Sequence, residues 1–533
     1  MEAHCTVTSY RQTNSFSDLV NDYLDNEPLL RKFFAFTADV DGIGAAIERR
    51  KKYNIDRNSL VETLQRQYSA LPEMPLVQSN IEALTEENTF TVCTAHQPNL
   101  LSGYLYFFYK IIHAIKLAET LNQEFPGKKF VPVYYMGSED NDLDELGQFR
   151  YGNEKYKWDA DGQTGAVGRM QTKSLKPLLE KLFRKLGPPG KNLDELTELI
   201  SASYLKHDTI AEATRYLVHQ LFGQYGLIVL NPDDAAFKKQ FARIIQDDLF
   251  NHSALPIVSA QSARLAETYK AQAFPREINL FYLKDNIRER IEKDGAIWKV
   301  LNTDIQFSKT ELEEELNSFP ERFSPNVILR GLFQETILPD VCFIGGGSEL
   351  AYWLQLKPLF EHYNVFYPVI LLRQSVQILS PQAIQLIARL GLDTTQIFEP
   401  TATVLKDLIV KENGEQWSVE KELNALSGLF LVLREKAKSI DSTLEKASDA
   451  VLTKIEKQVK ILEQKMYRAE KRKHNVVAER LDALHKEIYP AGGLQERVEN
   501  FMPYFLGYGF ELFETIKNNI DPINNQFLII NPK

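Results

Sequence analysis

The chain has 533 residues, of which 44% are hydrophobic, 11% aromatic and 25% charged, a composition typical of globular proteins with roughly two to four folding units. Its three cysteines include no CxxC pair, which argues against a disulfide framework and a zinc ribbon and favours a reducing, cytoplasmic location. The net charge of −10 disfavours nucleic acid as a partner, because a phosphate backbone would be repelled. No secretory signal is visible and the apolar runs are too short for a membrane span, so no membrane association is expected.

The first 85 residues are predicted to form a polar, helical segment. Residues 89–93 are rich in β-forming side chains and predict a strand. An apolar helical pattern begins after Ser102, a suitable N-cap, and ends near residue 125. Residues 130–135 predict a second strand. A strand, a helix and a strand in this order form a βαβ unit, which favours a parallel sheet.

Further alternation of strands and helices predicts a doubly wound α/β core over residues 86–414. Two insertions interrupt this core, near residues 149–222 and near residues 275–320. The first insertion combines short strands with helices, and the second is predicted to be a β-meander. The remaining core strands are expected at residues 227–230, 341–344 and 367–372.

Residues 415–490 predict a long antiparallel helical arm, since Pro is absent over most of this stretch. Its apolar residues are spaced three and four positions apart, which is the seam of a coiled coil. The seam consists of Leu452, Ile455, Val459, Leu462, Met466 and Ala469, and its phase slips near residues 470–474. Such an arm would expose an apolar stripe, so we expect a two-fold homodimer through it. Residues 491–533 are expected to pack back on the core.

The first candidate site follows the first predicted strand, where polar side chains are dense. They are Thr94, His96, Gln97 and Asn99. In open α/β sheets ligands bind at the carboxyl edge, where helix N-termini point inward. The alternative is an ordinary strand-to-helix turn shaped by Pro98. The polar density favours a site, with His96 as a catalytic candidate and the other three residues as binding candidates.

The loop after the second strand is acidic, with five carboxylates between Glu139 and Glu145. Such a cluster could hold a substrate ammonium group or Mg²⁺. The alternative is a solvated loop whose acids stabilise the next helix N-terminus. Because the loop lies at the same sheet edge, we favour a site. Glu139 and Asp140 are catalytic candidates and Asp142 is a binding candidate, whereas Asp144 and Glu145 are not expected to take part.

A glycine turn, Gly345-Gly346-Gly347-Ser348-Glu349, lies between a predicted strand and a helix. Glycines let backbone N–H groups approach an anion closely, but the spacing matches neither a dinucleotide fingerprint nor a P-loop. A tight turn is the alternative. Arg330 and Arg373 are candidate cationic partners for such an anion, with surface salt bridges as the alternative. Cys93 and Cys342 fall inside predicted core strands, where cysteine is usually an inert small hydrophobe.

Five blocks of sequence carry a resemblance that covers nearly the whole chain. They are Thr94-Ala95-His96-Gln97-Pro98 with residues 100–103, then residues 138–142, 324–330, 349–356 and 492–498. Together and in this order they resemble the bacillithiol biosynthesis cysteine-adding enzymes, the cysteine ligase family. The resemblance implies a Rossmann-like core related to class I aminoacyl-tRNA synthetases and a dimerising coiled-coil arm. It also implies the joining of cysteine to glucosaminyl-malate, the last step of bacillithiol biosynthesis.

Two stretches depart from the expected patterns. Class I synthetases carry His-x-Gly-His after the first strand, where this chain has His96-Gln97-Pro98-Asn99. A Gly-Pro-Gly-Glu sequence is expected before the Tyr-Trp helix, where this chain has Gly346-Gly347-Ser348-Glu349.

ATP is the expected co-substrate, because a carboxylate is a poor electrophile and needs activation before it can form an amide. Mg²⁺ is a candidate companion of the nucleotide. Two other functions stay open: a nucleotidyl transferase with another acceptor, and a non-catalytic coiled-coil scaffold. The polar residues at successive strand ends argue against the scaffold, which has no need of them.

Overall fold

The structure, a computed structural model, describes residues 2–413, 418–524 and 526–532. They form two compact units. One contains the chain up to Ile378 and again from Gly493 onward, and the other is Leu379–Gly492. The second unit therefore begins well before residue 415, where the arm was predicted to start. The predicted boundary between residues 414 and 415 lies outside the described residues.

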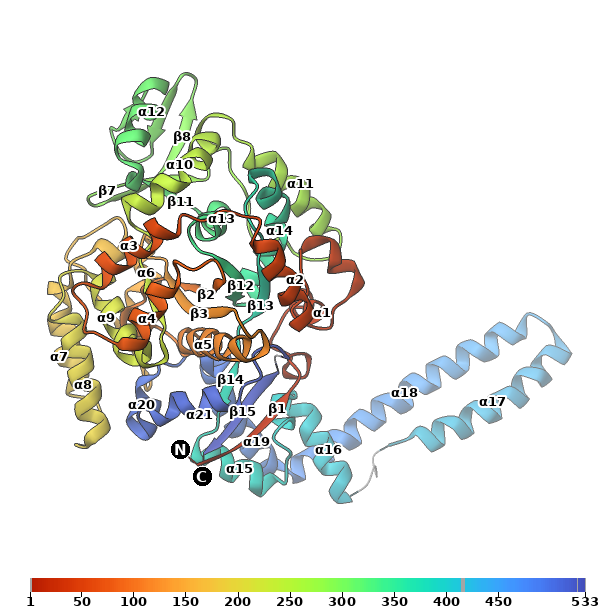
Figure 1. Cartoon of the computed structure of the whole chain (residues 1–533). Helices are drawn as coiled ribbons and strands as arrows, with labels where there is room; N and C mark the ends of the chain where they lie inside the picture. Colours follow the sequence, from red (N-terminus) through yellow and green to blue (C-terminus); the bar gives the residue numbers. More distant parts are fainter. Residues whose placement is uncertain (1, 414–417, 525, 533) are drawn as a thin grey trace. The chain divides into compact units, whose positions relative to one another are not determined.

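A parallel sheet of five strands forms the centre of the first unit, in the order β13-β12-β2-β3-β6 (Figure 1). The strands are β2 (Thr89–His96), β3 (Lys129–Met136), β6 (Ile228–Leu230), β12 (Asp340–Gly345) and β13 (Val369–Leu372). Almost every strand residue is buried, as is usual for a parallel sheet covered on both faces. Helices α5 (Tyr106–Glu124) and α14 (Gly347–Tyr363) connect neighbouring strands. The predicted doubly wound α/β core is confirmed.

The turn between β2 and α5 differs from its prediction. The helix begins at Tyr106, and not directly after Ser102. Leu101, Ser102 and Gly103 have φ values of 47°, 65° and 66°, which lie in the left-handed region and do not fit a helix start. The Asn500 side-chain amide donates to the carbonyls of Leu101 (2.9 Å) and Gly103 (2.6 Å). The prediction of Ser102 as the N-cap was wrong because the residue that shapes this turn is distant in sequence.

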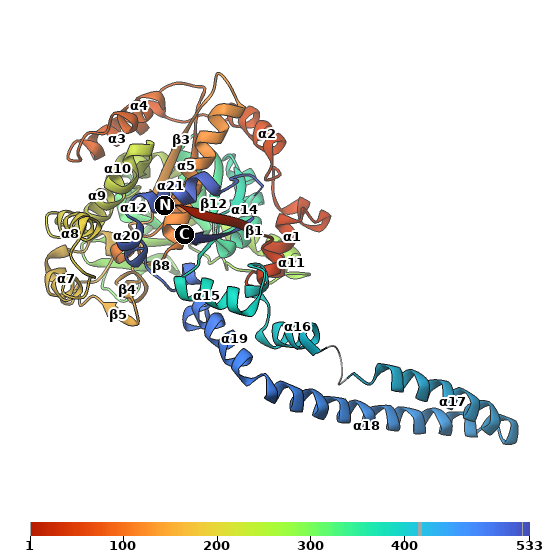
Figure 2. The ribbon, with the colours of Figure 1, turned by 90° about the horizontal axis from the view of Figure 1, so that it is seen from below.

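The two ends of the described chain meet in a second sheet, of three strands in the order β1-β15-β14. Strand β1 (Ala3–Thr8) pairs antiparallel with β15 (Phe527–Pro532), which pairs parallel with β14 (Val376–Ile378). Figure 2 shows the N- and C-terminal strands side by side. The expectation of a wholly helical segment over residues 1–85 was wrong for β1, whose pairing partner is at the other end of the chain. The helices of this segment are α1 (Asp18–Leu24), α2 (Val40–Arg50), α3 (Arg57–Tyr68) and α4 (Pro75–Ala83).

Two insertions lie between core strands, as expected. Between β3 and β6 the chain forms α6 (Leu143–Leu146), the hairpin β4 (Gln148–Tyr151) and β5 (Glu154–Lys157), and helices α7 (Lys176–Phe183), α8 (Lys191–Tyr204) and α9 (Ile210–Phe222). Between β6 and β12 it forms helices α10 (Ala235–Phe250), α11 (Ala254–Ala266), α12 (Lys309–Ser318) and α13 (Val327–Ile337). It also forms β7 (Leu280–Lys284), β8 (Ile287–Asp294), β9 (Ile297–Val300), β10 (Gln306–Phe307) and β11 (Phe323–Pro325). These five strands make an antiparallel sheet, the predicted meander with one further strand. Helices α20 (Met502–Tyr508) and α21 (Glu511–Asn519) complete the first unit.

The second unit is helical. It consists of α15 (Pro381–Leu390), α16 (Thr401–Asn413), α17 (Glu420–Ile440), α18 (Leu444–Lys473) and α19 (Asn475–Ile488). Helices α15 and α16 pack against α19, so this compact unit is larger than the predicted arm. Helices α17 and α18 lie side by side as a hairpin (Figures 1 and 2). The break between α18 and α19 at His474 falls where the apolar phase was predicted to slip. No helix of the described chain is long and apolar enough to cross a bilayer.

Candidate active site

A polar cavity of about 740 Å³ opens at the carboxyl edge of the parallel sheet. The loops after β2, β3, β12 and β13 all contribute to its wall, together with α13. Ten of the residues singled out from the sequence line it: His96, Gln97, Glu139, Asp140, Arg330, Gly346, Gly347, Ser348, Glu349 and Arg373. The three stretches predicted to form a site are therefore brought together by the parallel sheet, because its strand ends meet at one edge.

Four predicted binding residues lie elsewhere, because each is used by the fold. Thr94 is buried in β2 and its hydroxyl donates to the Ile344 carbonyl at 2.9 Å. Asn99 is buried and packs against Gly103. Asp142 accepts the Glu145 N–H at 3.0 Å as the N-cap of α6. Gly345 ends β12, and its carbonyl accepts the Arg373 N–H at 2.7 Å. Each of the four residues thus has a structural contact, and none of them lines the cavity.

His96 lies at the end of β2, with its ring packed edge-on against Tyr106 at 5.3 Å between centroids. Burial, together with the positive charges of Lys110 and Arg373, lowers the pKa of His96 well below its ordinary value. The imidazole is therefore neutral at neutral pH. Its Nε2 is buried and has no hydrogen-bond partner among the described residues. The neutral imidazole of His96, which lines the cavity, therefore has an unused proton-accepting nitrogen.

The two acidic catalytic candidates lie in different surroundings. Glu139 is buried and forms an ion pair with Lys238 of α10, which also donates to the Phe323 carbonyl at 2.8 Å. Burial raises the pKa of Glu139, and the Lys238 charge opposes that shift. Asp140 is partly exposed, accepts the Gln97 amide at 3.1 Å and lies 3.7 Å from the Arg288 guanidinium. Glu139 thus links α10 to the sheet through its ion pair, and Asp140 lines the cavity with its oxygens directed to Gln97 and Arg288.

Lys110 is the main cavity residue that the sequence analysis missed. Its buried Nζ donates to the Ala95 carbonyl at 2.9 Å and forms an ion pair with Glu349. Glu349 in turn accepts the Gly346 N–H at 2.8 Å, which closes the first turn of α14. The signal was present in the sequence, since Lys110, like His113, interrupts the apolar buried residues of α5.

The cavity is rich in cations, but most of them already have partners. Arg373 makes a two-pronged ion pair with buried Glu496, at 2.8 and 2.6 Å. Arg330 donates to the Tyr352 hydroxyl at 2.6 Å. Further lining residues outside the predicted set are Tyr106, Tyr135, Arg276, Arg288, Asn326 and Arg497. Glu145, which the sequence argument set aside, also lines the cavity, and burial beside Asp142 and Asp140 raises its pKa.

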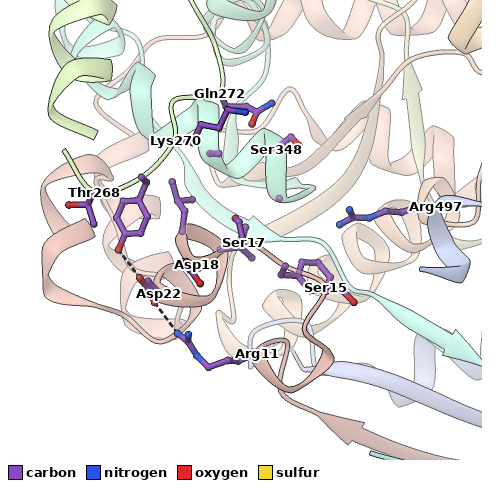
Figure 3. A pocket seen from close by; sticks show the side chains of 16 residues that line it. Arg11, Ser15, Ser17, Asp18, Asp22, Thr268, Lys270, Gln272, Ser348 and Arg497 are labelled. Atoms are coloured by element: carbon purple, nitrogen blue, oxygen red, sulfur yellow. Dashed lines mark hydrogen bonds and ion pairs between the residues drawn. The ribbon is translucent and has the colours of Figure 1, made fainter. Parts of the chain in front are cut away.

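A second cavity of about 630 Å³ adjoins the first, and the two share Gly347, Ser348 and Arg497. Figure 3 shows its polar wall, in which Arg11 pairs with Asp22. The Arg497 guanidinium stacks over the Phe16 ring at 5.5 Å. The N-terminus of α14 therefore lies between two polar cavities.

The fold and the cavity define a class of protein: a Rossmann-like α/β protein with a polar, arginine-rich cavity at the carboxyl edge of its parallel sheet. Residues 1–374 match the family model described as bacillithiol biosynthesis BshC, N-terminal Rossmann-like domain, and residues 376–532 match that of the C-terminal coiled-coil domain. The chain belongs to the BshC family of bacillithiol biosynthesis. The predicted resemblance is confirmed.

Relatives of this chain carry the name "Putative cysteine ligase BshC". One from Cytophaga hutchinsonii is 38% identical, with 96% of each chain covered, and one from Flavobacterium psychrophilum is 37% identical, with 98% of each covered. A more distant relative from Chloroherpeton thalassium is 29% identical over 94% of each chain. Among solved structures, a "putative arginyl t-RNA synthetase" from Campylobacter jejuni matches with 11% identity and a TM-score of 0.24, covering 80% of this chain and 98% of that one.

Proposed function

We propose that this protein is a cysteine ligase that joins the cysteine carboxyl group to the amine of glucosaminyl-malate, with ATP as the activating co-substrate. Membership of the BshC family carries the proposal, because relatives that match along nearly their whole length bear the name "Putative cysteine ligase BshC". The site supports it independently. Two adjoining polar cavities suit a reaction that must hold several small polar substrates at once.

The first turn of α14 is the best candidate for holding the activating phosphate groups. Helix N-termini bind anions because their first N–H groups have no partner within the helix and the helix dipole is positive there. Gly346 uses its N–H to bind Glu349, which leaves the N–H groups of Gly347 and Ser348, at the shared wall of the two cavities, to face a ligand. Lys110 holds Glu349 in place and so fixes this turn.

His96 is the candidate base for amide formation. As the acceptor amine nitrogen attacks the activated cysteine carbonyl carbon, a C–N bond forms, the activating phosphate group leaves and the nitrogen loses a proton. The neutral imidazole of His96, with its unpartnered Nε2, can take that proton. Asp140, which accepts the Gln97 amide, is the candidate for binding an ammonium group of a substrate.

The acidic loop does not fit a resident metal ion. Glu139 is already neutralised by Lys238, and the two Asp140 oxygens face Gln97 and Arg288. Within the described residues no group of three or more His, Cys, Asp or Glu side chains is arranged to hold a metal. We therefore assign no step to a protein-bound Mg²⁺, and the sequence-based idea of a magnesium site in this loop is not carried further.

A second copy of the chain is the proposed partner of the arm, which we define as α17 and α18. No residue of these two helices is buried, so the hairpin has no core of its own. Exposed apolar side chains lie on both helices, among them Leu431, Val432 and Leu462. An apolar stripe of this kind usually marks an interface, and a two-fold dimer would cover it.

The test is a product assay with the purified protein. Incubation with ATP, cysteine and glucosaminyl-malate should yield a product heavier than glucosaminyl-malate by one cysteinyl residue in mass spectrometry, together with ADP or AMP. Omission of any one substrate should abolish it. Pyrophosphate exchange into ATP without the acceptor, and no amide product with it, would instead support a nucleotidyl transferase.

A further inference from the structure

Arg276 differs from most of the other cations of the cavity. It lies in the loop between α11 and β7 and reaches the cavity wall. Its guanidinium makes no hydrogen bond or ion pair with any residue that the structure describes. The Arg497 guanidinium likewise has no hydrogen bond or ion pair with the described residues, but it stacks over the Phe16 ring. Arg288, Arg330 and Arg373, in contrast, donate to protein oxygens. An arginine at a cavity rim without an acidic partner is ready to bind an anion from solution.

The backbone of Arg276 is fixed by hydrogen bonds to a buried side chain, although the loop lies at the surface. Its N–H donates to Asn279 Oδ1 at 3.0 Å, and its carbonyl accepts Asn279 Nδ2 at 2.9 Å. Asn279 is fully buried and is bound by the buried Asp248 carboxylate, at 2.5 Å through its backbone N–H and 2.9 Å through its amide. Asn326, at the start of α13, donates to the same Asn279 oxygen at 3.2 Å. This buried network ties the Arg276 loop to the helix that carries Arg330.

The acid that follows Arg276 in the chain does not neutralise it. The Glu277 carboxylate lies 3.5 Å from His252 Nε2, so it is directed to a different partner. A buried Asp–Asn pair fixes the backbone of this exposed arginine, while the guanidinium has no partner. This arrangement positions the Arg276 side chain at the cavity. Buried polar groups are costly unless satisfied, so such a network indicates that the location of Arg276 matters.

We propose that Arg276 binds a carboxylate of the acceptor's malyl group and so selects acceptors that carry an acid on the sugar; this inference rests on the proposed function. The planar guanidinium pairs with a carboxylate through two parallel hydrogen bonds. A phosphate group of ATP has the same chemistry. The carboxylate is favoured because the α14 N-terminus, on another element, already offers a phosphate site.

The experiment compares steady-state kinetics of wild type, Arg276→Gln and Arg276→Lys. Arg264→Gln is the matched control, because Arg264 is an exposed arginine at the end of α11 outside the cavity. Loss of a two-pronged charged pair should raise KM for glucosaminyl-malate by about 10- to 100-fold in Arg276→Gln. KM for cysteine and for ATP should stay at the wild-type value, and Arg276→Lys should be intermediate because it keeps the charge but not the planar fork.

Free L-malate provides a second readout. It should compete with glucosaminyl-malate in the wild type, and its inhibition constant should rise in Arg276→Gln by the same factor as KM. An unchanged KM for the acceptor would overturn the proposal, as would a rise in KM for ATP alone, which would assign Arg276 to phosphate. A wild-type protein that forms no amide product at all would contradict the proposed ligase function instead, so the two failures are distinguishable.

Discussion

At the residue scale, a neighbouring lysine adds to the effect of burial in lowering the pKa of His96. The Lys110 ammonium, held by the Ala95 carbonyl and Glu349, contributes to the lowered pKa of His96. Removing this positive charge in Lys110→Met should raise the His96 pKa, so that the imidazole becomes protonated at a higher pH. The acidic limb of the kcat/KM profile should therefore move to higher pH, which a pH series of the ligation rate would measure.

Lys116→Met is the control for that change, because Lys116 lies on the same helix outside the cavity. Its pH profile should match that of the wild type. If the acidic limb of Lys110→Met stays in place, His96 is not the base. His96→Gln, which cannot take the proton, should lower kcat/KM by at least about 100-fold, with thermal melting as the check that the fold persists.

Asp140 and Asp144 allow a matched comparison within one loop. Asp140 faces the cavity and accepts the Gln97 amide, whereas Asp144 is largely exposed and pairs with Lys157 at the surface. Asp140→Asn should lower kcat/KM by about 10- to 100-fold through the loss of one charge-assisted contact. Asp144→Asn should behave as wild type in the same assay. Equal effects of the two substitutions would indicate that the acidic loop is solvated and does not bind a substrate.

At the element scale, the Arg373–Glu496 pair joins the end of β13 to the segment that follows the helical unit. Both side chains are buried, so Glu496→Gln would leave the arginine charge without its partner. Breaking a buried pair in this way costs about 3–5 kcal/mol, and urea unfolding should show a midpoint lowered accordingly. Asp144→Asn, at an exposed pair, should leave the midpoint unchanged. An unaltered midpoint in Glu496→Gln would mean that water or a rearranged Ser375 replaces the carboxylate.

The elements that local patterns predict well are those whose neighbours are close in sequence. The βαβ unit of β2, α5 and β3 follows from alternating apolar patterns, and so does the helix break at His474. Strand β1 could not be predicted from its own pattern, because it forms a strand by pairing with β15 at the other end of the described chain. The Ser102 turn fails for the same reason, since Asn500 shapes it.

The candidate site divides along a similar line. The carboxyl ends of parallel strands can be predicted to lie at one edge of the sheet. His96, Asp140 and Gly347 line the same cavity for this reason. One sequence does not predict which polar side chains form hydrogen bonds or ion pairs within the fold and so are not available to a ligand. Thr94 binds a neighbouring strand and Glu139 binds Lys238, and neither partner is near in the chain.

At the scale of the whole molecule, the exposed apolar residues of the arm lead us to expect a homodimer. Val459 and Leu462 lie on the apolar seam of α18, and Leu462 is 54% exposed. Replacing both with Glu would place charge in the proposed interface, where it is costly. Sedimentation should then show a monomer with an unchanged circular dichroism spectrum.

Glu substitutions of Thr453 and Lys460 are the matched control, since both residues are exposed and lie one position beyond a seam residue on α18. This variant should remain a dimer. A wild-type protein that sediments as a monomer at micromolar concentration would contradict the proposed dimer.

The terminal sheet has a consequence for biosynthesis. Thr8 pairs with Phe527, so β1 leaves the ribosome long before its pairing partner β15 is synthesised. During that interval the edges of β1 and β14 are unpaired, and unpaired edges favour aggregation. Pairing partners so distant in sequence also slow folding. The nascent chain should therefore depend on chaperones until β15 emerges, and stalled chains that end after the arm should be degraded faster than full-length protein.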